Sequence, residues 1–338
     1  MIALIFVGLA IVIGFIQVKL APTVLQNLFC EYKFDMKLAE PGEIITCRNK
    51  LLNAWRFPVA YINYIIHLPE GAEIVNGKGK AERHRLFLMP EQKFENDIRF
   101  TLPKRGVYKS GKYYLETGDF LGFNSKVVSE DIKADIVIMP EKSQNEHIIK
   151  TLGGYIGDIS VRRFIIEDPV LTVGFREYTG KEPMKSISWN QSAKRNELMV
   201  KNNDYTTDTN VAVVLNMQGN DREKLEECFR ISRTVCEQLE EKRIPYEFIC
   251  NGDVGNCNEG YGRNHLNYIM KRLGRSNLFS YYSFDELIDR CIEKRKNNRS
   301  YIVITSGSSK NEMSCLNRLQ AASNQEICVL QAGGNDNG

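Results

Sequence analysis

The sequence predicts an α+β multidomain protein. A transmembrane helix comes first, then an antiparallel β-sandwich-like domain, then a Rossmann-like α/β domain with a mostly parallel sheet. Residues 2–18 form an apolar run, residues 34–141 alternate short strands with turns, and strands alternate with helices after Thr206. The 338 residues suffice for two domains, and the apolar content of 43% is typical of a globular protein.

The N-terminal run IALIFVGLAIVIGFIQV carries no charged side chain. Extended to residue 21, it reaches about 20 residues, the length needed to cross a hydrocarbon layer about 30 Å thick. A cleaved signal peptide is the main alternative, but no basic side chain precedes the run. A buried core helix is a further alternative, although such helices are usually shorter and amphipathic. We therefore expect a single-pass anchor over residues 1–21, embedded in the lipid bilayer of the cell membrane.

The basic residues and the cysteines both place the rest of the chain in the cytoplasm. Lys19, Lys33 and Lys37 follow the apolar run, and positive charge tends to remain on the cytoplasmic side. The nine cysteines are odd in number and include no C-x-x-C pair, so neither a disulfide framework nor a zinc site is indicated. We expect reduced, mostly buried thiols, as in a reducing compartment.

The β domain is predicted over residues 30–145. Its first strand shows the alternation Phe34-x-Met36-x-Leu38, and turn sequences such as Pro41-Gly42 separate the strands that follow. Short strands at regular spacing favour a small sandwich or barrel.

The α/β domain is predicted over residues 206–332, followed by a disordered tail at residues 333–338. Continuous apolar runs predict buried strands. Helical periodicity predicts a helix within residues 221–243 and another over residues 314–322, and Ser283-x-x-Glu286 is a capping box that opens a third. The predicted strands are Asn210–Leu215, Tyr246–Cys250, Tyr301–Thr305 and Ile327–Gln331.

The polar segment that joins the domains, residues 150–205, contains the most distinctive pattern. It contains R-x-Y at residues 176–178, I-x-W at residues 187–189 and S-A-K at residues 192–194. This pattern is similar to the signature of the bacterial domain of unknown function 58 family. The chain departs from that signature at Lys181, Lys185 and Lys194, and Glu182 stands where the family has an aspartate. The candidate interaction residues of this signature segment are Arg176, Tyr178, Glu182, Trp189, Ser192 and Lys194.

This resemblance implies a membrane protein with a von Willebrand factor A-like domain that works beside a MoxR-type AAA ATPase. It implies no reaction, because the family's activity is not established. The expected function is therefore a membrane-anchored adaptor that binds protein and helps the ATPase assemble or mature its clients. The alternative is a hydrolytic enzyme of the cell envelope that uses the carboxyl edge of the α/β sheet.

The carboxyl edge of that sheet lacks the ligands of a metal site. A metal-binding A-type domain carries D-x-S-x-S after its first strand, because hard divalent cations prefer charged oxygen ligands. Here Asn216, Gln218 and Asn220 occupy those positions, and neutral amides suit turns and helix caps better. We therefore expect that the chain binds neither a metal nor another cofactor. We also expect that this edge of the sheet still binds a partner.

Other chemistries find little support in the sequence. The net charge of +3 comes from 45 basic and 42 acidic residues without a basic tract, which argues against nucleic acid as a partner. A phosphate-binding G-x-x-x-x-G-K-[ST] loop is absent, and the four histidines are dispersed. We therefore expect a chain that is not an enzyme. The signature segment has two interpretations: Tyr178 and Trp189 pack internally while Arg176 pairs with Glu177 or Glu182, or the segment is a recognition surface.

Overall fold

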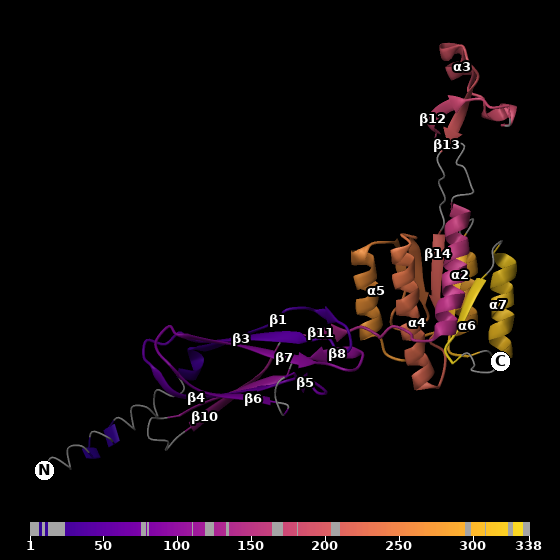
Figure 1. The fold of residues 1–338 in the computed structure, drawn as a ribbon. Coiled ribbons are helices and arrows are strands. Elements are labelled where there is room, and N and C mark those ends of the chain that lie inside the picture. Colours follow the sequence, from indigo (N-terminus) through magenta and orange to yellow (C-terminus); the bar gives the residue numbers. More distant parts are fainter. Residues whose placement is uncertain are drawn as a thin grey trace. The chain divides into compact units, whose positions relative to one another are not determined.

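The computed structural model describes most of the chain. The chain divides into two compact units. One consists of Met1–Glu141 with Leu273–Arg275, and the other of Lys142–Arg272 with Ser276–Gly338 (Figure 1). Each is described by itself. The described residues are 7–8, 11–12, 24–75, 79, 81–109, 111–118, 125–132, 135–163, 172–180, 182–203, 210–294, 299–307, 309–323 and 327–333.

The first unit is built from two four-stranded antiparallel sheets and one three-stranded sheet. The first sheet has the order β1 (Leu28–Phe34), β3 (Ile45–Asn53), β7 (Lys93–Thr101), β5 (Glu73–Ile74). The second has the order β10 (Ser125–Asp131), β9 (Lys112–Gly118), β4 (Val59–His67), β6 (Ala81–Leu88). The third has the order β2 (Leu38–Ala39), β11 (Asp135–Ile138), β8 (Gly106–Lys109).

Period-two alternation produces the core of this unit. In β3 every second side chain is buried, from Ile45 through Cys47, Asn49 and Leu51 to Asn53. These side chains face one side of the sheet, and the apolar ones, Ile45, Cys47 and Leu51, share a cluster with Tyr64 of β4 and other residues of the second sheet.

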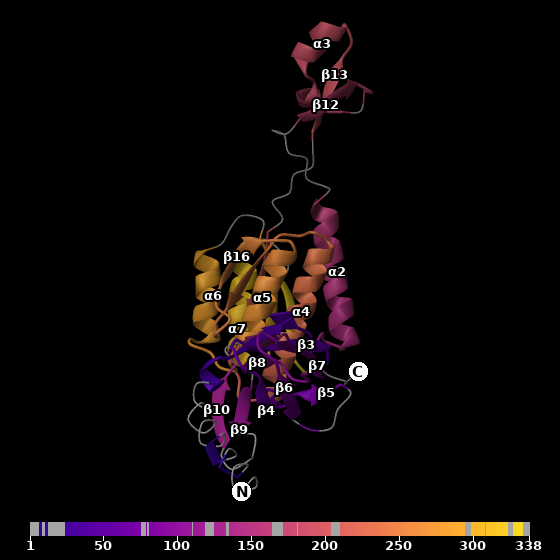
Figure 2. The same cartoon turned by 90° about the vertical axis from the view of Figure 1, so that its left-hand side faces the viewer.

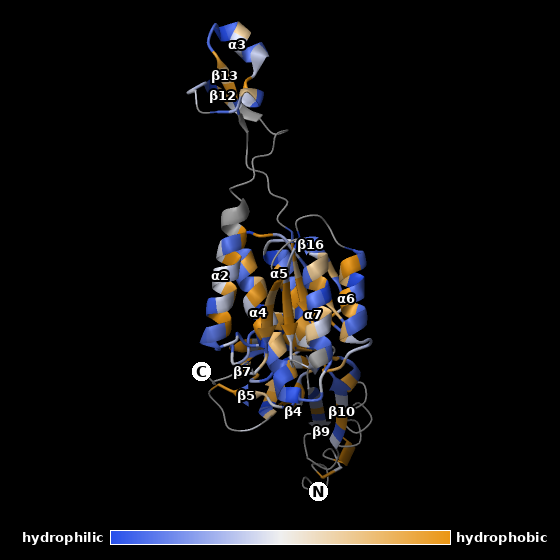
Figure 3. Cartoon of the chain, turned by 90° about the vertical axis from the view of Figure 1, so that its right-hand side faces the viewer, coloured by the Kyte–Doolittle hydropathy of each residue, from blue (hydrophilic) through white to orange (hydrophobic). Residues whose placement is uncertain are grey.

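The α/β part of the second unit has a five-stranded sheet between helices. Its order is β16 (Cys257–Gly260), β15 (Tyr246–Cys250), β14 (Asn210–Leu215), β17 (Arg299–Thr305), β18 (Ile327–Gln331). Only the β15–β16 pairing is antiparallel. All six residues of β14 are buried, which explains its continuous apolar sequence. Figure 3 shows apolar strands at the centre and hydrophilic outer helix faces.

The helices of this unit cover both faces of the sheet (Figures 2 and 3). Helices α6 (Phe284–Glu293) and α7 (Lys310–Ala322) pack with Ala212 and Val214 in one cluster. Helices α2 (Glu146–Arg163) and α4 (Arg222–Glu241) lie on the other side of the strands, and α5 (Arg263–Arg275) follows β16. The chain leaves β14 for β15 on one side and later returns to β17 on the other. The carboxyl ends of β14 and β17 therefore flank a point where the strand order reverses.

The signature segment forms a small element of its own. Strands β12 (Thr172–Glu177) and β13 (Met199–Asn203) pair antiparallel, and between them lie a 3-10 turn at Met184–Ser186 and helix α3 (Trp189–Arg195). Ile187 bridges to Val200 and is buried, so this element has a small apolar centre.

These observations correct the predicted fold class. The part of the chain that the structure describes holds no helix long and apolar enough to cross a membrane. The predicted transmembrane anchor, and the single-pass location at the cell membrane that depended on it, are therefore wrong. Of residues 1–21, the structure describes only 7–8 and 11–12. Hydropathy alone suggested the span, but crossing a bilayer also requires a continuous helix.

The description of the chain as a Rossmann-like, von Willebrand factor A-like protein is also corrected. The chain is rich in β-strands, and most of its strand pairings are antiparallel. Among the described strands, parallel pairing occurs between β11 and β2 and in the five-stranded sheet of the second unit. Residues 334–338 of the predicted disordered tail lie outside the described residues.

Candidate functional site

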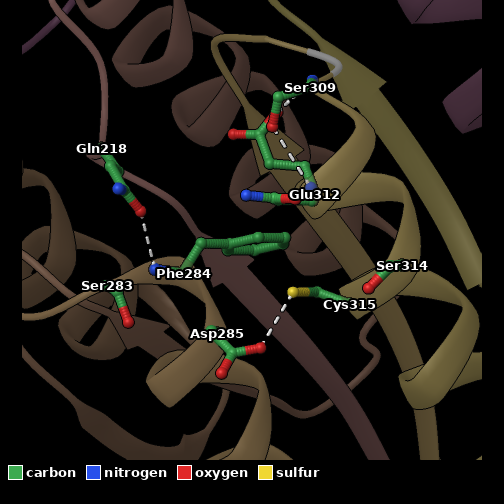
Figure 4. Close-up of a pocket in the computed structure, with 9 residues that line it drawn as sticks. Gln218, Ser283, Phe284, Asp285, Ser309, Glu312, Ser314 and Cys315 are labelled. Carbon is green, nitrogen blue, oxygen red and sulfur yellow. Dashed lines mark hydrogen bonds between the residues drawn. The ribbon is translucent and has the colours of Figure 1, made fainter.

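The candidate site lies where β14 and β17 end and where helices α6 and α7 begin. Ligands of open α/β sheets bind at this carboxyl edge, at the point where the strand order reverses. A hollow of about 530 Å³ opens there (Figure 4). It is lined by Gln218, Ser283, Phe284, Asp285, Ser309, Asn311, Glu312, Ser314 and Cys315.

Asn216 is the centre of a hydrogen-bond network beneath this hollow. The residue follows β14 directly and is completely buried. Its Nδ2 donates to Thr305 Oγ1 and to Glu312 Oε1, each at 3.2 Å. Its Oδ1 accepts from the backbone N–H of Gln218 and from Asn251 Nδ2, each at 3.0 Å. One neutral amide thus joins the ends of three adjacent strands.

Two further amides extend this network to the surrounding loops. Asn251 follows β15, accepts from the Met217 backbone N–H at 2.7 Å and donates to the Tyr282 carbonyl at 3.1 Å. The Gln218 side chain accepts from the Phe284 backbone N–H at 2.8 Å, at the start of α6. Since each amide has both a donor and an acceptor group, these residues satisfy buried polar atoms without any charge.

Glu312 is positioned by the cap of α7. Ser309 Oγ accepts from the Glu312 N–H at 3.2 Å, and Glu312 Oε2 accepts from the Ser309 N–H at 3.0 Å. This reciprocal capping box fixes the first turn of the helix. The other carboxylate oxygen accepts from Asn216, so the carboxylate is held by donors on two elements.

Asp285 and Cys315 join α6 to α7 at the side of the hollow (Figure 4). The Cys315 thiol donates to Asp285 Oδ1 at 3.2 Å, and Arg318 Nη2 donates to the same oxygen at 2.6 Å. Arg318 also pairs with Asp289 at 3.1 Å. Burial, and then the bond to Asp285, raises the pKa of the Cys315 thiol. Cys315 is therefore a protonated thiol at neutral pH, which is a poor nucleophile.

The three positions of the degenerate metal motif have different surroundings. Asn216 and Gln218 belong to the amide network, whereas Asn220 is exposed just before Asp221, which caps α4. Among the described residues, no three histidine, cysteine, aspartate or glutamate side chains gather in a way that could hold a metal ion. The expectation that the chain needs no metal stays a prediction.

The signature residues lie together on the β12–β13 element. Arg176 donates to Glu182, which also accepts from the Thr179 hydroxyl at 2.9 Å. Ser192 is buried; its hydroxyl donates to the Ser188 carbonyl and accepts from the Met199 N–H, both at 2.8 Å. The side chains of Arg176 and Ser192 therefore stabilise the β12–β13 element itself.

The remaining signature side chains are less enclosed. Trp189 is 62% exposed, Tyr178 is half-buried and Lys194 is exposed, so Trp189 does not pack into a core within the described residues. Lys181 lies outside the described residues. The role of the signature residues in recognition stays a prediction.

Two residues of the carboxyl edge, Asp285 and Glu312, were not predicted from the sequence. Ser309-x-x-Glu312 has the same capping-box spacing as Ser283-x-x-Glu286 and would have placed Glu312 at a helix start. Asn251 directly follows a predicted strand, where polar residues reach the edge of the sheet. No sequence signal indicates that Asp285 meets Cys315, because that contact depends on how two helices pack.

Comparison with known proteins does not show a family, and no family model matches this chain. YeaD, an uncharacterized protein of Bacillus subtilis strain 168, is 21% identical over 183 residues. The match covers 53% of this chain and 44% of that relative, so the chain spans less than half of the relative's length.

Some solved structures resemble one third of the chain at low scores. A CARDB domain from Pyrococcus furiosus, in complex with di-metal ions, has a TM-score of 0.23 and 14% identity, covering 33% of this chain and 91% of that one. Native alpha-2-macroglobulin from Escherichia coli, from domain MG7 to the C-terminus, has a TM-score of 0.27 and 14% identity, covering 34% and 17%. These scores are too low to support an inference about fold or function.

Proposed function

We propose that this chain is a non-catalytic protein-interaction module that binds a protein partner at the carboxyl edge of its C-terminal sheet. The observation that carries this proposal is the amide network of Asn216, Gln218 and Asn251. Neutral amides fix the loops around an open polar hollow, and one of them also donates to the Glu312 carboxylate. A rigid surface of this kind loses little conformational entropy when a partner binds.

The ionisable groups of the hollow favour binding over catalysis. A general acid or base needs a free position from which it reaches a substrate. Glu312 accepts from Ser309 and Asn216, and Asp285 pairs with Arg318. A hydrolytic enzyme remains the second candidate, because these two carboxylates line the same hollow. Hydrolysis would require that the carboxylate of Asp285 or Glu312 break its present hydrogen bonds.

The resemblance to the domain of unknown function 58 family suggests a MoxR-type AAA ATPase as the partner. In that case the chain is an adaptor that presents the ATPase with clients for assembly or maturation. The resemblance supplies the class of partner, and the carboxyl edge supplies a surface with the required solvent access.

Site-specific photo-crosslinking to a purified MoxR-type ATPase tests this proposal. Asn311 lines the hollow and is exposed, whereas Lys150 is an exposed residue of α2 and serves as the control. With p-benzoylphenylalanine at either position, we expect nucleotide-dependent crosslinks from position 311 and few from position 150. Equal crosslinking from both positions, or none from position 311, would overturn the proposal.

A further inference from the structure

Two exposed aromatic side chains stand beside the hollow, in the loop between α5 and α6. Phe279 is 41% exposed and Tyr281 is 67% exposed. Their ring centroids are 5.0 Å apart in an edge-to-face arrangement. Single exposed aromatic residues are common, but a contacting pair forms a larger apolar patch, and aromatic residues are enriched where proteins bind one another.

This loop is fixed to the same sheet edge as the amide network. The Tyr281 N–H donates to the Asn251 carbonyl at 2.7 Å, and Ser280 forms a bridge with Gly252. Ser283, two residues after Tyr281, already lines the hollow. The aromatic pair and the hollow therefore form one continuous surface around the end of β15.

Asp253 supplies a negative charge directly at this aromatic pair. Its Oδ1 accepts from the Tyr281 hydroxyl, and its Oδ2 accepts from Asn277 Nδ2 at 2.8 Å. Burial acts in the opposite direction, but the hydrogen bonds from Tyr281 and Asn277 prevail and hold the pKa of Asp253 below its ordinary value. The carboxylate is therefore ionised at neutral pH.

Within the described part of the chain, no lysine or arginine forms an ion pair with Asp253. The nearby Arg272 is engaged elsewhere, since it donates to the Tyr268 hydroxyl at 3.1 Å and lies 5.6 Å from the centre of that ring. In the adjoining hollow, the lining residues include two acidic side chains, of which Asp285 is paired with Arg318. At the aromatic pair itself, the Asp253 carboxylate thus offers a negative charge to a basic partner.

We propose that Asp253, Tyr281 and Phe279 form a subsite for an arginine side chain of a basic segment of the partner. This inference rests on the proposed function and adds the chemistry that the partner must present. The guanidinium group lies over the exposed Tyr281 ring and forms an ion pair with Asp253. Arginine fits better than lysine because its planar group stacks on a ring while its N–H groups reach a carboxylate.

Titration of the isotope-labelled chain with short peptides, followed by NMR, tests the subsite. The probes are acetyl-Gly-Arg-Arg-Gly-amide and the matched lysine and glutamate peptides. We expect the arginine peptide to shift the amide signals of residues 253 and 279–281 and to bind several-fold more tightly than the lysine peptide. Asp253→Asn keeps the acceptor oxygen but removes the charge, and should weaken the arginine peptide about fivefold. Tyr281→Ala should weaken binding of the arginine peptide by a similar factor.

Tyr261→Ala is the matched control, because Tyr261 is an exposed aromatic residue outside the proposed subsite. Its effect on peptide binding should be negligible. Equal binding of the arginine and lysine peptides, or unchanged binding in Asp253→Asn, would overturn the arginine subsite. Crosslinking of the ATPase at position 311 that is unaffected by Asp253→Asn and Tyr281→Ala would leave the proposed function standing and refute this inference. Binding of the arginine peptide without that crosslink would refute the proposed function alone.

Discussion

At the scale of single residues, the buried amide of Asn216 decides the character of the carboxyl edge. Replacing it with aspartate turns a donor to Glu312 into a second carboxylate at the same position. We expect Asn216→Asp to lower the free energy of unfolding by about 2–4 kcal/mol at pH 7, because a buried carboxylate would then face the half-buried carboxylate of Glu312. Urea denaturation monitored by circular dichroism measures this change.

Asn216→Ala is the control for this prediction. It removes the same hydrogen bonds without adding charge and should cost about 1–3 kcal/mol at any pH between 5 and 7. The aspartate variant should instead regain stability as the pH falls, since one of the paired carboxyl groups has a raised pKa and takes up a proton. A pH-independent loss in both variants would contradict the proposed contact with Glu312.

The Arg176–Glu182 pair gives a second prediction at this scale. The guanidinium of Arg176 lowers the pKa of Glu182 from 4.5 to about 2. Because the folded-state pKa is depressed, the contribution of this pair is present above pH 4.5 and is lost as the pH falls towards 2. In an NMR titration, Arg176→Gln should move the Glu182 midpoint back towards 4.5, and Lys194→Gln should leave it unchanged. A wild-type midpoint near 4.5 would show that the pair does not form.

At the scale of elements, α2 shows how composition can hide a helix. It spans Glu146–Arg163, most of which lies in the polar segment from residue 150 onward, where no helix was predicted. Its glycines at positions 153, 154 and 157 weaken the pattern, because glycine has low helix propensity. Helix α7 also begins earlier than predicted, at Lys310 and not Ser314, because its capping box was not recognised.

Replacing a glycine of α2 with alanine should stabilise this helix. A Cβ atom at Gly153 would meet nothing within 4 Å. We expect Gly153→Ala to raise the free energy of unfolding by about 0.5–1 kcal/mol, because alanine loses less backbone entropy in a helix. Gly111→Ala provides the opposite case, since its Cβ would lie 1.6 Å from the His67 carbonyl oxygen. Thermal unfolding should show a gain for the first variant and a marked loss for the second.

At the scale of the whole molecule, nine free cysteines are distributed over both units, and eight of them are buried. Burial raises the pKa of Cys47, Cys228 and Cys250 to about 12, so these thiols are protonated at neutral pH. We expect slow reaction with a disulfide reagent in the native protein and nine reactive thiols after denaturation without reductant. Fewer than nine would indicate a disulfide, and fast native reaction would contradict the burial.

The sequence by itself determined the elements whose patterns are local. The strands Asn210–Leu215, Tyr246–Cys250 and Ile327–Gln331 have the predicted limits. The first is buried at every residue, as its continuous apolar run predicted. The transmembrane span predicted from hydropathy at the N-terminus was wrong, because no described helix is long and apolar enough to cross a membrane.

Only the tertiary structure decided which polar residues meet. Asn216, Asn251 and Glu312 lie far apart in the sequence and come together because parallel strands end at one edge of a sheet. The same holds for Asp253 and Tyr281, whose contact depends on the loop that joins α5 to α6. Periodicity reports the neighbours of a residue along its own element, whereas a binding surface depends on contacts between elements.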